Sequence, residues 1–170
     1  MTLVKVDKVY SSTVQIETNW LPSIRQAGKM ESTLLKLRLE LRRFALDANR
    51  LSSTSVGAVK EANIALVKVT NAYAQFVSSP EEKNKYDQVI RDIQAYNLKV
   101  DELLAMDSSH SAADLSVFFR DYTSPLAVKL QSMIGELLAI NETGGQAAVA
   151  TAAHEYDAAR LFTLILMVAS

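Results

Sequence analysis

Apolar residues recur at alternating intervals of four and three along most of the chain, which is the spacing of helices packed in a bundle. In the first such run the apolar residues are Met30, Leu34, Leu37, Leu41, Phe44, Ala48 and Leu51. The same spacing returns in three later segments, and in the last of them the predicted buried face is Leu126, Leu130, Met133, Leu137, Ile140, Gly144, Ala147 and Thr151. The pattern therefore predicts an all-α protein.

Short polar segments divide this pattern into four helices. Two helices of about 50 residues, each ~75 Å long at the rise of a helix, enclose two of roughly half that length. Short connections favour an antiparallel, up-down-up-down four-helix bundle, with a long first and fourth helix and both chain ends at one end. The predicted helices cover residues 3–50, 55–77, 80–106 and 112–170.

Capping residues mark two of the helix starts. Ser79 suits an N-cap, Pro80 the first helical position, and Glu82 the residue that closes a capping box. Ser111 and Asp114 offer a second capping box at the start of the fourth helix.

Two kinds of helix-weakening residue lie inside the long helices. Pro22 and Pro125 each remove a backbone hydrogen bond and crowd the preceding turn. Because Trp20 and its apolar neighbours continue past Pro22, we expect a kinked but continuous helix there. Gly144 and Gly145 cost about 1–2 kcal/mol relative to alanine; they either let the first helix approach closely, form a soft spot, or are simply tolerated.

Composition narrows the class of function. The 170 residues include no cysteine, which excludes disulfides, thiolate zinc sites and thiol catalysis. The formal net charge of −1 provides no excess of positive charge for binding nucleic acid. The two histidines, His110 and His154, are far apart, and no serine has a histidine partner. The sequence thus predicts a protein with no cofactor, no metal site and no enzymatic activity.

The last ten residues, 161–170, are almost wholly apolar. They amount to about half of a bilayer-spanning helix. They are either a helix end buried in the bundle or the first turns of a transmembrane helix. We assign residues 1–160 to the bundle domain and 161–170 to the start of a transmembrane helix.

The first helix carries three arginines, Arg38, Arg42 and Arg43. Guanidinium groups remain charged and offer a planar donor fork that matches a carboxylate. The arginines therefore form either an anion site or solvated charges that pair with acids such as Glu40 and Asp47.

A second apolar strip runs along the same helix at Leu35, Leu39 and Leu46. A helix with two apolar strips contacts neighbours on two sides. The strip is typical of a bundle that also dimerises.

Several motifs together resemble a known family. They are Asn19-Trp20-Leu21-Pro22-Ser23, the arginines with Phe44, and Ser79-Pro80-Glu81-Glu82-Lys83 with Tyr86. The chain resembles, over essentially its whole length, the four-helix-bundle ligand-binding domain of bacterial methyl-accepting chemotaxis proteins. That resemblance implies a homodimeric chemoreceptor domain in the periplasm, held in the inner (plasma) membrane by flanking helices, with no nucleic-acid partner.

The resemblance also implies a ligand site between two subunits near the membrane-distal end. Arg38 and Arg43 match, with the same spacing, two arginines of aspartate-sensing members. Five residues turn a helix through ~500°, so these two point about 140° apart and one from each subunit would meet the ligand. Thr123-Ser124-Pro125-Leu126 resembles the Thr-x-Pro-Leu of the fourth helix, which implies a ligand contact by Thr123 and a signal that passes along that helix.

The departures from the pattern concern the ligand. Asp47 stands one turn after Arg43, where aspartate-sensing members have an arginine, so aspartate itself is disfavoured. Nearby aromatic residues favour an aromatic or cyclic carboxylate, while dicarboxylates and tricarboxylates stay open. The predicted ligand-binding residues are Arg38, Arg42, Arg43, Tyr96, Phe119, Asp121, Tyr122 and Thr123.

Two alternative functions stay open. One is a structural or partner-binding bundle without a ligand, in which the arginines only pair with neighbouring acids. The other is the same sensor module on a kinase or a cyclase. Stabilisation by an organic acid separates the sensor from the inert bundle.

Overall fold

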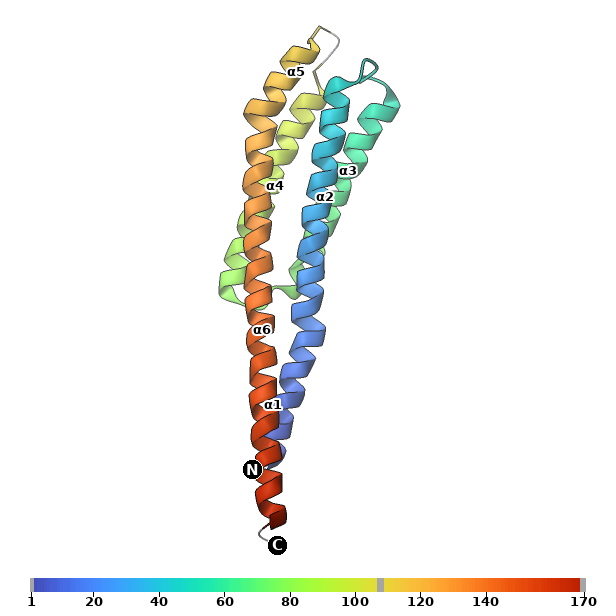
Figure 1. Ribbon diagram of the computed structural model, residues 1–170. Helices are drawn as coiled ribbons and strands as arrows, with labels where there is room; N and C mark the ends of the chain where they lie inside the picture. Colours follow the sequence, from blue (N-terminus) through green and yellow to red (C-terminus); the bar gives the residue numbers. More distant parts are fainter. Residues whose placement is uncertain (1, 107–108, 169–170) are drawn as a thin grey trace. The chain divides into compact units, whose positions relative to one another are not determined.

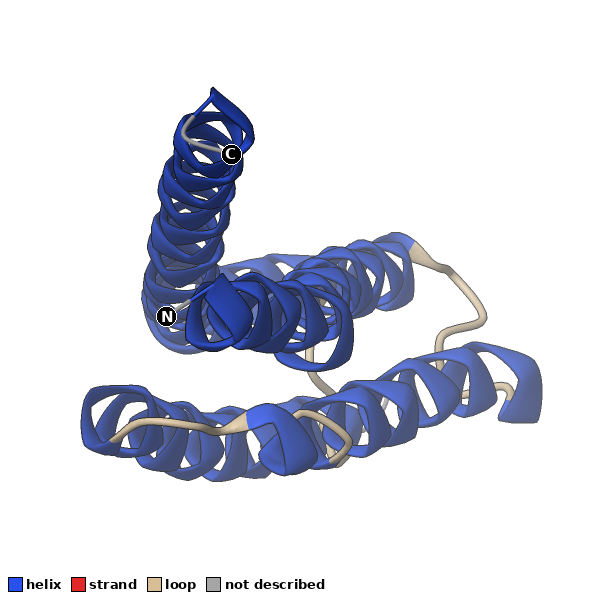
Figure 2. Ribbon diagram, turned by 90° about the horizontal axis from the view of Figure 1, so that it is seen from below, coloured by secondary structure: helices blue, strands red, loops and turns tan. Residues whose placement is uncertain are grey.

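The computed structural model describes residues 2–106 and 109–168, which form helices joined by short loops (Figure 1). No strand occurs among these residues (Figure 2). The predicted all-α bundle, with a long first and fourth helix and two shorter ones, is confirmed. The elements are α1 (Thr2–Gln15), η1 (Ile16–Trp20), α2 (Leu21–Leu46), α3 (Ser53–Asn71), η2 (Ala74–Phe76), α4 (Pro80–Leu104), α5 (Ala112–Phe118), η3 (Phe119–Thr123) and α6 (Ser124–Val168).

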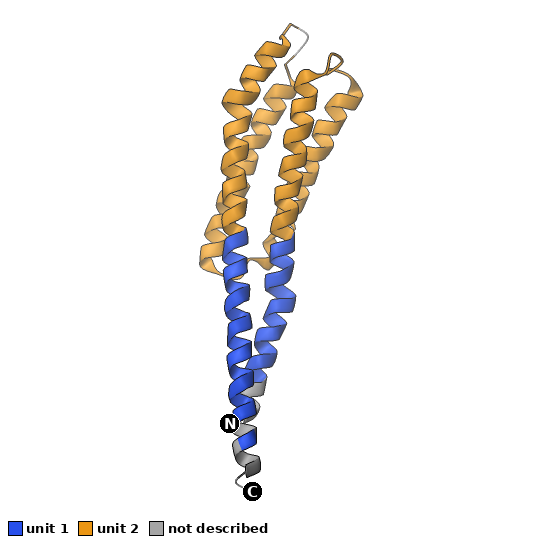
Figure 3. Ribbon diagram, viewed as in Figure 1, with its two compact units in different colours: residues 1–25, 138–170 blue, residues 26–137 orange. Residues whose placement is uncertain are grey.

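The chain divides into two compact units (Figure 3). The bundle unit comprises residues 26–137, and the end unit combines residues 1–25 with 138–170. Helices α2 and α6 each contribute to both units.

Four helical segments lie side by side in the bundle unit: α2, α3, α4 and the run from α5 into α6 (Figure 1). Each contributes apolar side chains to one buried core. The predicted seam of the first helix is buried as far as Phe44, whereas its last two residues, Ala48 and Leu51, are exposed because they follow the end of α2. Large core residues include Met30, Leu34, Leu37, Leu41, Phe44, Leu66, Tyr73, Tyr96, Leu103, Leu115, Leu130 and Ile134.

Helix α2 ends at Leu46, four residues before the predicted end. Asp47 accounts for this, because its Oδ1 accepts a hydrogen bond from the backbone N–H of Asn49, 2.8 Å away. Its other oxygen accepts from the hydroxyl of Ser55. An aspartate bonded to its own downstream backbone stabilises a turn in place of a helix. The predicted extension of the helix to Arg50 was wrong for this reason.

Both predicted caps are confirmed. Ser79 caps α4, with its hydroxyl accepting from the backbone N–H of Glu82 at 3.1 Å, and Pro80 opens the helix. Ser111 and Asp114 form a reciprocal capping box at α5: the N–H of Asp114 donates to the Ser111 hydroxyl at 3.2 Å, and the N–H of Ser111 donates to the Asp114 carboxylate at 2.7 Å.

The helices continue past both internal prolines, as predicted for Pro22, because each proline follows a widened turn. The N–H of Leu21 bonds to the carbonyl of Ile16, five residues back. In the same way the N–H of Ser124, just before Pro125, bonds to the carbonyl of Phe119. A π-turn moves the preceding carbonyls away from the proline ring, which removes the clash of a regular α-turn.

The buried face of α6 beyond residue 137 differs from the predicted one. The apolar pattern favoured Ile140 and Ala147, whereas the structure buries Asn141 and Ala148. The prediction was wrong because Asn141 is polar, so an apolar pattern passes over it.

Helix α6 extends through most of the apolar tail, to Val168. Residues 169–170 of the predicted transmembrane start lie outside the described residues, as do most side chains of the tail. Among the described helices, none has a stretch long and apolar enough to cross a bilayer. The assignment of 161–170 stays a prediction.

Candidate functional site

The bundle unit carries a cleft of about 410 Å³ near the loops that follow α2 and α4. Its volume lies within the range of small-molecule sites. Helix α2 forms one wall, and α5, η3 and the start of α6 form the other. We call it the arginine cleft; its lining residues are Arg42, Ala45, Leu46, Ser116, Phe119, Arg120 and Ser124.

Arg42 and Phe119 face each other across the arginine cleft. The guanidinium carbon of Arg42 lies 5.6 Å from the centre of the Phe119 ring, which is a cation–π contact. No acidic side chain in the described part of the chain pairs with Arg42. The cleft therefore contains a positioned cation with an open donor fork.

Arg120, the second cation of the cleft, is neutralised by Asp121. Its Nε donates to Oδ1 of Asp121 at 2.7 Å and its Nη2 donates to Oδ2 at 3.0 Å. The hydrogen bond from Arg120 lowers the pKa of Asp121 below its ordinary value. The carboxylate is therefore charged at neutral pH, and the pair adds almost no net charge to the cleft.

The other two arginines predicted as ligands lie outside this cleft. Arg38 donates from Nη1 to the side-chain oxygen of Gln131 on α6, 3.1 Å away. Arg43 forms an exposed ion pair with Glu40, at 3.0 Å, three residues back on the same helix. Arg38 and Arg42 line a smaller hollow of about 240 Å³ on the outer face of α2.

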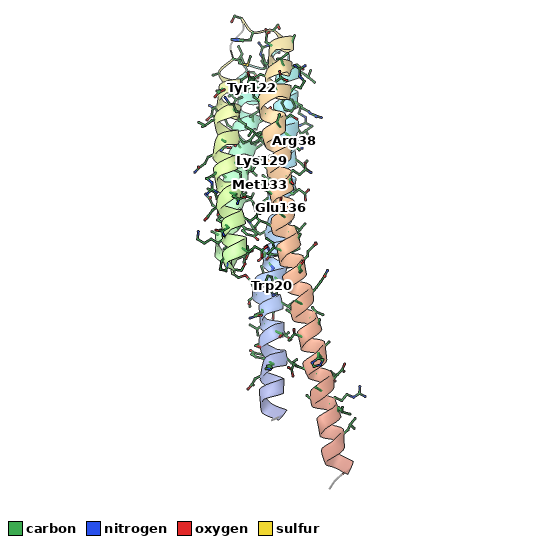
Figure 4. The ribbon with its side chains drawn as sticks, turned by 90° about the vertical axis from the view of Figure 1, so that its left-hand side faces the viewer. Trp20, Arg38, Tyr122, Lys129, Met133 and Glu136 are labelled. Atoms are coloured by element: carbon green, nitrogen blue, oxygen red, sulfur yellow. The ribbon has the colours of Figure 1, made fainter. Side chains whose placement is uncertain are left out.

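The remaining predicted ligand residues also lie apart from the cleft lining. Thr123 is buried, and its hydroxyl donates to the carbonyl of Phe119 at 2.9 Å. Tyr122, labelled with Arg38 in Figure 4, is half exposed and packs on Phe118, with ring centres 4.9 Å apart.

Tyr96 belongs to the core of the bundle unit. Its side chain is fully buried, and burial raises the pKa of its hydroxyl. Among the described residues that hydroxyl has no hydrogen-bond partner. Of the eight predicted ligand residues, the cleft thus brings together Arg42 and Phe119.

Sequence reasoning missed Ser116, Arg120 and Ser124, which line the cleft beside Phe119. Their spacing of four residues places all three on one side of the helical run from α5 into α6. A polar stripe beside the buried face, one residue after Leu115 and Thr123, is the signal that identifies them.

The second apolar strip of α2 is exposed in the single chain, as its pattern predicts. The relative exposure is 46% for Leu35, 48% for Leu39 and 81% for Leu46. Leu46 also lines the arginine cleft, so the strip and the cleft are continuous.

The chain is an antiparallel bundle of two long and two shorter helices, and a cleft lined by Arg42 and Arg120 opens between α2 and the run from α5 into α6. The chain belongs to the family described as the four helix bundle sensory module for signal transduction, whose family model matches residues 1–156.

A solved structure described as the periplasmic sensor domain of a sensor histidine kinase has the same fold, with a TM-score of 0.71 and 18% sequence identity. The likeness covers 83% of this chain and 94% of that chain. No curated protein matches the chain in a sequence search.

Proposed function

We propose that this sensory module detects a small organic acid in the arginine cleft, in the periplasm, as the homodimeric input domain of a chemoreceptor. One observation carries the proposal: Arg42 is held over Phe119 without an acidic partner in the described chain. A carboxylate hydrogen-bonded to a guanidinium contributes about 1.5–3 kcal/mol. A bound carboxylate would use the two donors of Arg42 that a neighbouring acid does not occupy.

The charge balance of the cleft favours a monocarboxylate over di- and tricarboxylates. Arg120 is already paired with Asp121, so Arg42 supplies the net positive charge. The walls add apolar surface from Ala45 and Leu46 and an aromatic face from Phe119. An acid with one carboxylate and an apolar or aromatic body matches this lining.

The dimer proposal is supported by the exposed strip of Leu35, Leu39 and Leu46 next to the cleft. Contiguous exposed leucines on a soluble domain favour association. A second subunit on this strip would add its own residues to the open side of the cleft. The resemblance to chemoreceptors, which implies one arginine from each subunit, agrees with such a composite site.

Signal transmission through α6 is supported by the continuity of that helix. Ser124 at its start lines the cleft, and the helix continues to Val168. A ligand that favours one of two positions of α6 shifts the population toward it. The same input module on a histidine kinase is the alternative, supported by the similarity to the periplasmic sensor domain of a sensor histidine kinase.

A thermal-shift panel of organic acids on the purified domain tests the proposal. We expect one monocarboxylate with an apolar body to raise the melting temperature, and Arg42→Ala to abolish the rise. Arg43→Ala is the matched control, because the neighbouring arginine is paired with Glu40 outside the cleft. Failure of every acid to shift the wild type, or equal loss in both variants, refutes the site.

The charge argument has its own test in Asp121→Asn. That variant frees Arg120, so the cleft would gain one net positive charge. We expect its preference to move toward dicarboxylates by about tenfold, equivalent to ~1.4 kcal/mol. An unchanged preference would mean that Arg120 takes no part in choosing the ligand.

A further inference from the structure

The end unit contains a close fit between Trp20 and two glycines of α6 (Trp20 is labelled in Figure 4). A Cβ atom built on Gly144 would lie 2.4 Å from Cη2 of the Trp20 ring and 2.5 Å from Cζ3. A Cβ on Gly145 would lie 3.4 Å from Cβ of Trp20 and 3.8 Å from Cγ. The indole thus occupies the volume that a side chain at position 144 would need.

Gly144 differs in this respect from the other glycines. At Gly28, Gly57 and Gly135 an added Cβ meets nothing within 4 Å. Glycine inside a helix costs about 1 kcal/mol relative to alanine. At position 144 that cost is offset by a ring packed directly against the backbone of α6, so of the two adjacent glycines Gly144 is the one that the fit requires.

Trp20 is the last residue of the π-turn η1, which ends two residues before Pro22. A widened turn alters the direction in which side chains leave the helix. The π-turn, Trp20 and Pro22 lie within seven residues of one another, so the local backbone sets the direction in which the Trp20 side chain leaves the helix.

The rest of the end unit specifies the alignment of its helices weakly. Its buried residues with described side chains are small or polar: Ser12, Ser23, Asn141 and Ala148. An exposed ion pair, Lys8 with Glu155 at 3.5 Å, adds little, since such pairs contribute about 0–1 kcal/mol. The fit of the Trp20 ring against Gly144, at the notch left by the missing side chain, is a contact with a specific shape within this unit.

We propose that Trp20 and Gly144 form a register lock, a contact that holds the N-terminal helical segment and α6 at one axial alignment. Any movement of α6 along its neighbour requires the ring to turn or to leave the notch. The lock itself is a property of the end unit. Its consequence for signalling, a threshold that ligand binding must overcome, rests on the proposed role of α6.

Fluorescence tests the lock directly, because Trp20 is the only tryptophan in the chain. In Gly144→Ala we expect the emission maximum to move to longer wavelength and the acrylamide quenching constant to rise about twofold, because the displaced ring loses its packed surroundings. Gly145→Ala is the matched control on the same helix and should leave both values near those of the wild type. Equal behaviour of the two variants overturns the proposal.

Cross-linking gives a second measurement of the helix alignment, which does not use the fluorescence of Trp20. The chain has no cysteine, so Lys8→Cys with Glu155→Cys introduces one defined thiol pair for a short bis-maleimide. A pair of Lys8→Cys with Ala159→Cys reports an alignment one helical turn away. We expect Trp20→Ala to lower, several-fold, the ratio of the cross-linking rate of the 8/155 pair to that of the 8/159 pair. An unchanged ratio overturns the lock even if Gly144→Ala does not fold.

A double variant separates a steric lock from general destabilisation. With the ring removed in Trp20→Ala, the additional change Gly144→Ala should leave the cross-linking ratio unaltered. None of these measurements uses a ligand. A failure of the arginine cleft to bind acids would therefore leave the register lock standing, and a failure of the lock would leave the cleft untouched.

Discussion

Replacement of Glu82 by alanine is expected to destabilise the protein more than any surface change on α4. Glu82 is fully buried at the N-terminus of that helix. One carboxylate oxygen accepts from the hydroxyl of Tyr73 at 2.5 Å. The other accepts from the backbone N–H of Ser78 at 2.8 Å and from its hydroxyl at 3.1 Å.

The magnitude follows from the donors that the carboxylate satisfies. Each charge-assisted hydrogen bond contributes about 1.5–3 kcal/mol, and a buried donor left without a partner carries its full desolvation cost. The buried Tyr73 hydroxyl contributes most of the cost and the part-buried Ser78 N–H the rest, which together give about 3–5 kcal/mol for Glu82→Ala. For a domain of this length, that corresponds to a fall of roughly 6–20 °C in melting temperature.

Urea unfolding followed by circular dichroism measures the change. Glu81→Ala is the matched control, since Glu81 precedes Glu82 in the same helical turn but is exposed. It should cost less than about 1 kcal/mol, which is the scale of a helix-dipole contact. Similar losses of unfolding free energy in the two variants would refute the assignment of the cost to buried hydrogen bonds. Tyr73→Phe combined with Glu82→Ala should cost less than the sum of the two single changes, because both remove the same bond.

Two further predictions concern single polar groups. Tyr96→Phe should leave the unfolding free energy unchanged or raise it slightly in urea denaturation, because the buried hydroxyl of Tyr96 has no partner among the described residues. The pKa of Asp47 is lowered by hydrogen bonds from the Ser55 hydroxyl and then the Asn49 N–H. Its stabilising effect is therefore present above the ordinary value of 3.8 and lost as the pH falls through the lower pKa of the folded state. Asp47→Asn should accordingly be less stable than the wild type at pH 7, with a difference in urea midpoint that shrinks below pH 3.8.

The number and type of the helices could be predicted because the spacing of apolar residues repeats over many turns. On α2 the residues at this spacing, Met30, Leu34, Leu37, Leu41 and Phe44, are all buried. Helix ends were less predictable, since Asp47 ends α2 through hydrogen bonds to Asn49 and Ser55 that spacing does not reveal. The face of α6 was misjudged where a polar residue, Asn141, is buried.

That arginines of α2 line a cleft could be predicted from the sequence, whereas which of the arginines do so could not. Arginine chemistry pointed to the stretch of α2 that lines the cleft, and Arg42 and Phe119 of that lining were among the predicted residues. Whether an arginine faces a cleft or an acid depends on neighbours a few ångströms away, such as Glu40 beside Arg43. Sequence distance does not distinguish those two outcomes, because the adjacent residues Arg42 and Arg43 have different partners, an aromatic ring for Arg42 and an acid for Arg43.

Both π-turns stand next to a residue with a proposed role, and this follows from the chemistry of proline. In η1 the widened turn ends at Trp20, and in η3 it begins at Phe119. Pro22 and Pro125 lack the N–H that an α-turn would use, so the hydrogen-bond ladder is already interrupted at each point. Exchange of a π-turn for an α-turn there disturbs fewer bonds than elsewhere in the helix. Each proline therefore follows a π-turn that keeps the helix continuous and sets the direction in which the nearby ring leaves it, Trp20 toward Gly144 and Phe119 toward Arg42.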